Sequence, residues 1–105
     1  MNDDILSVYI GNDDVMDWAM ITGKDIIMPE LLRSCEYLLY NELEEVKCMN
    51  LFAEVASTVV KVEFIVKPID VNNTLSKILE WAEQEEEYEL CARTTTLQDY
   101  VNGSV

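Results

Sequence analysis

The stretch NTLSKILEWAEQEEEYELCAR, residues 73–93, decides how the second half of this chain folds. Its apolar residues first recur at helical spacing, at Leu75, Ile78, Leu79 and Ala82. An acidic block without a basic residue follows, formed by Glu83, Glu85, Glu86, Glu87 and Glu89. An apolar stripe then resumes at Tyr88, Cys91 and Ala92. The pattern predicts two short helices joined by a tight acidic corner, the first capped by the side-chain oxygens of Asn72, Asn73 or Thr74.

Upstream of this stretch, VVKVEFIVK at residues 59–67 has the alternation of a strand with one buried side. The face we expect to be buried carries Val60, Val62, Phe64 and Val66, and Pro68 ends the strand. The nearest partner for it is residues 46–55, although Ala56, Ser57 and Thr58 make a poor hairpin turn. The alternative partner is the short apolar run ILSVYI at residues 5–10.

The first half of the chain is dominated by one amphipathic helix. Pro29 suits a first helical turn, because its missing N–H would have no partner there. Apolar residues then follow at i, i+3, i+4 and i+7 spacing, at Leu31, Leu32, Cys35, Leu38, Leu39, Leu43 and Val46.

The segment before Pro29 is predicted to hold a short helix, VMDWAMI, capped within residues 12–14 and ending before Gly23. Met16, Ala19 and Met20 would share one face of it. Residues 24–28 would be a linker whose Ile26 and Ile27 plug the core. We therefore expect a small single α+β domain over residues 1–105, with one amphipathic helix, a short antiparallel sheet and a C-terminal helical hairpin.

The charge balance is the unusual property of this chain. Its 105 residues include 21 acidic and 7 basic ones, for a net charge of −14. Such a field repels nucleic acid and anionic membranes and attracts basic protein surfaces. We therefore expect neither direct nucleic-acid binding nor membrane binding. Acidity that serves only to keep the protein in solution is the simpler interpretation.

The residues that usually perform catalysis are scarce. The chain has no histidine, its three glycines are isolated, and Cys35, Cys48 and Cys91 are scattered. Nucleophile–base pairs and zinc sites commonly need histidine or clustered thiolates. We expect no enzyme, no metal and no cofactor. The N-terminus MNDDILSVYIG lacks a signal peptide, and no apolar run approaches the roughly 20 residues of a membrane span. These features, with an odd number of cysteines, predict a cytoplasmic protein with reduced thiols.

Residues 79–92, LEWAEQEEEYELCA, resemble the UVR motif, a helical hairpin found in nucleotide-excision-repair subunits and some protease adaptors. The residues that carry the resemblance are Leu79, Ala82, Glu87, Tyr88, Glu89, Cys91 and Ala92. In the motif the aromatic residue packs against the first helix, so Tyr88 would contact Leu79 and Ala82. The family continues with a leucine-arginine-aspartate step, where this chain has Thr94, Thr95 and Thr96. The resemblance implies the hairpin shape and a tendency to bind protein.

Two functions fit these features. The first is a small acidic module that engages a basic surface of a partner protein through Glu83, Glu85, Glu86, Glu87 and Glu89. A helix lined with carboxylates can imitate the phosphates of nucleic acid, and small phage-type inhibitors and immunity proteins are similar in size and charge. The alternative is an adaptor or structural module that forms a homodimer, or docks a partner helix, through the apolar face of the hairpin. Salt dependence separates the two, because only the charge-driven complex weakens steeply as salt rises.

Overall fold

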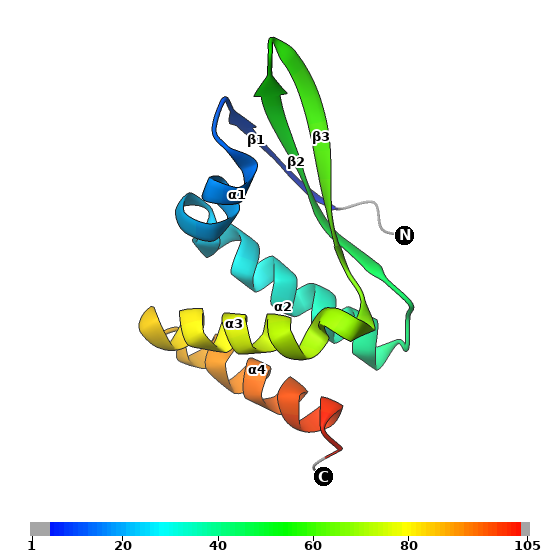
Figure 1. Cartoon of the computed structure of the whole chain (residues 1–105). Coiled ribbons are helices and arrows are strands. Elements are labelled where there is room, and N and C mark those ends of the chain that lie inside the picture. Colours follow the sequence, from blue (N-terminus) through cyan, green and yellow to red (C-terminus); the bar gives the residue numbers. More distant parts are fainter. Residues whose placement is uncertain (1–4, 104–105) are drawn as a thin grey trace.

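The computed structural model describes residues 5–103 and has an α+β architecture, as predicted (Figure 1). In chain order the elements are β1 (Leu6–Gly11), α1 (Val15–Asp17), the π-helical turn η1 (Trp18–Thr22), α2 (Lys24–Tyr40), β2 (Val46–Val55), β3 (Thr58–Val66), the 3-10 turn η2 (Pro68–Asp70), α3 (Val71–Gln84) and α4 (Tyr88–Val101). No helix within residues 5–103 is both long enough and apolar enough to cross a membrane.

The three strands form one mixed sheet in the order β1-β2-β3. The predicted pairing of residues 46–55 with the following strand is confirmed, since β2 and β3 are antiparallel neighbours. The alternative pairing with residues 5–10 is wrong, because β1 pairs with β2 instead and runs parallel to it. A parallel neighbour needs a long crossover, which the helical segment between β1 and β2 supplies. The sheet is therefore only partly antiparallel.

The helices lie on one side of the sheet, and the other side is left open (Figure 1). Residues that are paired across the sheet share a face, so Val8, Leu51 and Val62 point toward the helices, and Leu51 is fully buried. The neighbouring row points away, with Tyr9 and Lys61 exposed on the open face. The predicted faces of residues 59–67 are confirmed, although Val60 near the hairpin tip is exposed.

Helix α2 begins earlier than its proline suggested. It starts at Lys24, so Pro29 lies inside the helix and the prediction of a linker at residues 24–28 is wrong. The carbonyl of Gly23 accepts bonds from the N–H groups of Ile26 and Ile27 at 2.9 Å, which closes a first turn ahead of the proline. Ile27 is buried as predicted, whereas Ile26 is exposed.

The core face of α2 agrees with the predicted stripe up to the end of the helix. Leu32, Cys35 and Leu38 are almost completely buried, and Leu31 and Leu39 are half-buried. The helix ends at Tyr40, so the last two members of the stripe lie beyond it: Leu43 is in the following loop and Val46 opens β2.

The short N-terminal helix is present, but its buried face differs from the prediction. The Asp14 carboxylate caps it by accepting the N–H of Asp17 at 3.1 Å. The Gly23 N–H then donates to the carbonyl of Trp18, five residues back, and this wider turn rotates the following side chains relative to an α-helix. Trp18 and Ala19 are buried, whereas Met16 and Met20 are exposed, so of the three residues predicted to share a face only Ala19 is buried.

The C-terminal helix pair has the predicted hairpin shape, with α3 and α4 in contact. Helix α3 begins at Val71, directly after η2, so residues 72–74 lie within its first turn and provide no side-chain cap, contrary to the prediction. Its buried residues are Val71, Leu75, Ile78, Trp81 and Ala82.

Helix α4 packs through residues other than the predicted stripe. Thr94 and Leu97 are fully buried, Leu90 and Val101 pack at the edge of the core, and the Thr94 hydroxyl donates to the Leu90 carbonyl at 2.7 Å. Of the predicted stripe, Cys91 is half-buried, and Tyr88 and Ala92 are exposed. The spacing Leu90, Thr94, Leu97 and Val101 is helical, and a buried threonine inside it hid the pattern.

The turn between β2 and β3 offers a test of backbone strain. Ala56 and Ser57 are its two central residues and both have positive φ, 51° and 66°, as a type I′ turn requires. Because a left-handed backbone costs a residue other than glycine roughly 1–2 kcal/mol, we expect the double substitution Ala56→Asn with Ser57→Gly to raise the free energy of unfolding by about that amount. Urea denaturation measures this change, and an unaltered midpoint would contradict the assigned turn.

Candidate functional site

The five predicted glutamates lie within seven residues at the connection between α3 and α4, a segment that we call the acidic corner. Glu83 lies in the last turn of α3, Glu85, Glu86 and Glu87 connect the helices, and Glu89 lies in the first turn of α4. All five side chains are exposed. The structure therefore brings all five predicted site residues together.

The backbone of the acidic corner closes as a Schellman motif. The Glu87 N–H donates to the Ala82 carbonyl at 2.9 Å, and the Glu86 N–H donates to the Glu83 carbonyl at 3.2 Å. This geometry places Glu86 in the left-handed region, at φ +58°. Glycine is the usual residue at such a position because it has no Cβ. Glu86 thus holds its carboxylate at a position where glycine would be more stable.

The helix dipoles stabilise some glutamates of the acidic corner and destabilise another. Glu87 and Glu89 flank the N-terminus of α4, where negative charge stabilises a helix by about 0.3–1 kcal/mol per residue. Glu83 lies at the C-terminus of α3, where the same dipole is unfavourable. Folding therefore favours acid at Glu87 and Glu89, and it disfavours acid at Glu83.

Within residues 5–103 no basic side chain forms an ion pair with the acidic corner, although Glu89 adds, after Glu36, to the raised pKa of Arg93, which lies one turn further along α4. Within residues 5–103 the glutamates that form ion pairs are Glu30, Glu36 and Glu63. All three lie on α2 or β3, outside the acidic corner. The corner therefore presents its negative charge to solvent.

Tyr88 stands between the last two carboxylates of the acidic corner. We expected its ring to pack against Leu79 and Ala82, but it is 71% exposed, so that prediction is wrong. The contact of α4 with the core begins at Leu90, two residues further on, and the ring is left on the outer side. The corner therefore combines five carboxylates with one exposed aromatic ring.

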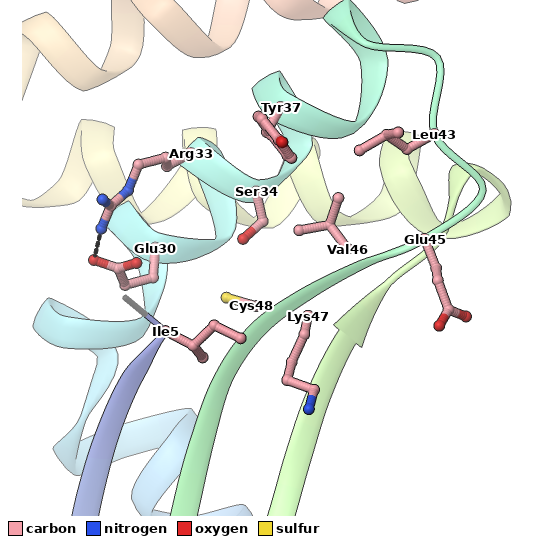
Figure 2. Close-up of a pocket in the computed structure, with 10 residues that line it drawn as sticks. All are labelled: Ile5, Glu30, Arg33, Ser34, Tyr37, Leu43, Glu45, Val46, Lys47 and Cys48. Carbon is pink, nitrogen blue, oxygen red and sulfur yellow. Dashed lines mark hydrogen bonds and ion pairs between the residues drawn. The ribbon is translucent and has the colours of Figure 1, made fainter. Parts of the chain in front are cut away.

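A second feature, a groove of about 640 Å³, lies between α2 and the start of β2 (Figure 2). The side chains around it include Arg33, Ser34 and Tyr37 from α2, and Lys47 and Cys48 from β2. These residues are far apart in sequence, and no motif pointed to them. Their basic groups are already occupied, since Arg33 pairs with Glu30, and the Nζ atom of Lys47 lies 2.9 Å from a carboxylate oxygen of Glu63.

The two buried thiols in this region are not activated. Burial raises the pKa of Cys48 to about 11, against a smaller lowering by the hydrogen bond with Ser34. Burial likewise raises the pKa of Cys35 to about 12, with a further contribution from Cys48. A nucleophilic cysteine needs a lowered pKa, so both thiols are protonated at neutral pH. Within residues 5–103 no cluster of metal-ligating side chains suited to an ion is formed.

The acidic corner thus holds five exposed carboxylates within seven residues. The resemblance of residues 79–92 to the UVR motif stays a prediction. Comparison with protein-family models, with curated proteins and with solved structures gave no match to this chain.

Proposed function

We propose that this protein is a small binding module whose acidic corner engages a basic surface of a partner protein. The observation that supports this most directly is the set of five exposed carboxylates, none of which forms an ion pair within residues 5–103. Exposed carboxylates of this kind form charge-assisted hydrogen bonds with arginine and lysine. The net charge of −14 would also accelerate the encounter with a basic surface.

The acidic corner is held by a rigid support, which favours binding. Arg93 on α4 donates from Nη2 and Nε to both carboxylate oxygens of Glu36 on α2, at 2.7 and 3.1 Å. Further along, the rings of Tyr40 and Tyr100 meet edge to face, with their centroids 5.1 Å apart. Because α4 is fixed to α2 at both places, little conformational freedom would be lost on binding.

The chemistry of the acidic corner indicates the class of partner. Arginine and lysine residues that neutralise phosphates in a nucleic-acid-binding protein would also accept a closely spaced row of carboxylates. Tyrosine is enriched among the residues that contribute most to protein interfaces, and Tyr88 is available at this site. A protein that normally binds nucleic acid, inhibited by this nucleic-acid mimic, is therefore the partner class that we propose.

The alternative, an adaptor that dimerises or docks through the apolar hairpin face, is less well supported. The residues that would form this face include Leu75, Ile78 and Leu97, and all three are fully buried in the chain's own core. Their exposure would require α3 or α4 to detach from α2. The acidic corner needs no such rearrangement.

Two matched substitutions test the proposal. Glu42, which follows the C-cap of α2, has φ +53° and the same pattern of Schellman hydrogen bonds as Glu86. Replacement of either residue by glycine should relieve left-handed strain and raise the free energy of unfolding by about 1 kcal/mol. Glu86→Gly also removes a carboxylate from the acidic corner, whereas Glu42→Gly removes one elsewhere.

The partner for this test is captured on the immobilised protein at low salt and identified after elution with rising salt. Calorimetry then gives its affinity for both variants. We expect Glu86→Gly to bind several-fold more weakly and Glu42→Gly to bind like the wild type. Equal affinities of the two variants would count against the acidic corner as the binding surface.

A further inference from the structure

Strand β3 forms an edge of the sheet with a free side. It pairs with β2 on one side, and within residues 5–103 no strand pairs with it on the other. The hairpin of β2 and β3 extends beyond the helices, so much of this edge stands clear of them (Figure 1). A free edge presents unpaired N–H and C=O groups to any strand of suitable register.

The hairpin turn determines which residues direct those groups outward. A two-residue loop closes on a hydrogen-bonded pair, here Val55 with Thr58, and such pairs alternate along an antiparallel ladder. The backbone groups of residues 58, 60, 62 and 64 therefore point toward β2. Those of residues 59, 61, 63 and 65 point to the free edge.

The charges along the free edge of β3 are complementary to those of a second copy of β3 that runs antiparallel to it. Lys61 and Glu63 lie two residues apart on the open face of the sheet, where Lys61 lies 3.3 Å and Lys47 2.9 Å from the same exposed Glu63 carboxylate within one chain. A second copy would exchange the Lys61 contact for the equivalent one across the axis. When two copies of β3 run antiparallel with Val62 opposite Val62, Lys61 of each copy lies opposite Glu63 of the other. A shift by two residues in the partner strand places Lys61 opposite Lys61, or Glu63 opposite Glu63, and like charges directly opposite are destabilising. Only the register centred on Val62 both forms the backbone hydrogen bonds between the two strands and places opposite charges across from each other.

We propose that a second copy of this chain pairs with β3 edge to edge, about a two-fold axis at Val62, and that the two sheets join into one. This interface is separate from the acidic corner and does not depend on the proposed function. A lysine on an edge strand commonly discourages pairing. Here Glu63 lies on the same face, so Lys61 of each copy would form an ion pair with Glu63 of the other.

The apolar side of the strand supports the same register. Val62 and Phe64 are only partly buried, and Val60 is exposed. With Val62 at the two-fold axis, Val60 of each copy lies opposite Phe64 of the other, and the two Val62 side chains meet. Pairs of aromatic and β-branched residues are favourable across strands. The dimer would therefore cover apolar surface that the monomer leaves in contact with water.

Cysteine cross-linking tests the register. The two Val62 residues would form a non-hydrogen-bonded pair with Cα atoms about 4.5 Å apart, a separation that a disulfide accepts. In a Cys91→Ser background, which leaves only the buried Cys35 and Cys48, we expect Val62→Cys to form a disulfide-linked dimer on mild oxidation. Val60→Cys is the matched control and should stay unlinked, because Phe64 of the second copy would face it.

Sedimentation equilibrium tests the dimer itself. We expect the wild type to approach twice its mass of 12.1 kDa, and to do so more readily as salt screens the repulsion between two chains of net charge −14. Lys61→Glu and Glu63→Lys should each give monomers, and the double exchange should restore the dimer, with circular dichroism confirming that every variant folds. Any one of three results would overturn the proposal. The wild type could be monomeric at every concentration, the Lys61→Glu variant could still form the dimer, or Val60→Cys and Val62→Cys could cross-link equally.

Discussion

Leu38→Ala should lower the free energy of unfolding by about 2–5 kcal/mol, as truncation of a buried leucine usually does. Leu38 is 1% exposed, and its carbonyl accepts the Leu43 N–H that closes the end of α2. Truncation would leave a cavity on the face of α2 that is packed into the core. Since small domains are stable by only about 5–15 kcal/mol in total, this loss should be evident in urea denaturation.

Leu39 is the matched control for Leu38. It is the next residue in α2 and is only half-buried, so Leu39→Ala should cost clearly less than Leu38→Ala. Both substitutions change helix propensity equally, and the difference between them therefore reports burial. Equal losses, or a Leu38→Ala variant that unfolds like the wild type, would contradict the facing of α2.

Gly23→Ala should also be strongly destabilising, and the reason is steric. A Cβ atom on Gly23 would lie 2.5 Å from the Cη2 and Cζ2 atoms of Trp18, far inside van der Waals contact. The φ of Gly23 is −97°, which any residue can adopt, so the backbone itself would accept alanine. The Trp18 ring is 6% exposed and has little room to move. Overpacking of this kind costs about 1–3 kcal/mol.

Thermal unfolding measures the effect of Gly23→Ala, and a changed tryptophan fluorescence would report displacement of the Trp18 ring. The exposed neighbour Thr22 provides a control, because Thr22→Ala should change stability by no more than about 0.5 kcal/mol. A Gly23→Ala variant with wild-type stability and fluorescence would show that Gly23 does not pack on Trp18.

The elements that could be predicted from the sequence have strong local patterns. The alternation at residues 59–67 identified β3 and its faces, and the helical spacing before the glutamates identified α3 and its buried face. The second helix of the hairpin was predicted, but its packed face was not. The acidic corner could be predicted because its five members are neighbours in sequence. The groove between α2 and β2 and the free edge of β3 depend on tertiary pairing, which leaves no signal in a single segment.

Several element boundaries lack the residues that usually mark them. Helices α2 and α3 are each followed by a left-handed residue, Glu42 and Glu86, at a position that glycine commonly fills. The β2–β3 turn uses Ala56 and Ser57 in place of asparagine and glycine. Pro29 suggested a helix start that is too late, because the carbonyl of Gly23 already accepts the first hydrogen bonds of α2. The four left-handed residues are all exposed, so the backbone takes these conformations without a residue type that signals them.

The binding of a partner protein across a range of salt concentrations tests the central claim most directly. Calorimetry would compare the wild type with a variant in which Glu83, Glu86 and Glu87 are replaced by glutamine, which we expect to fold normally. The proposed charge-driven contact predicts that wild-type affinity falls steeply with salt, and that the variant binds several-fold more weakly at low salt but almost equally at high salt. An affinity that is independent of salt and the same for both proteins would contradict binding through the acidic corner.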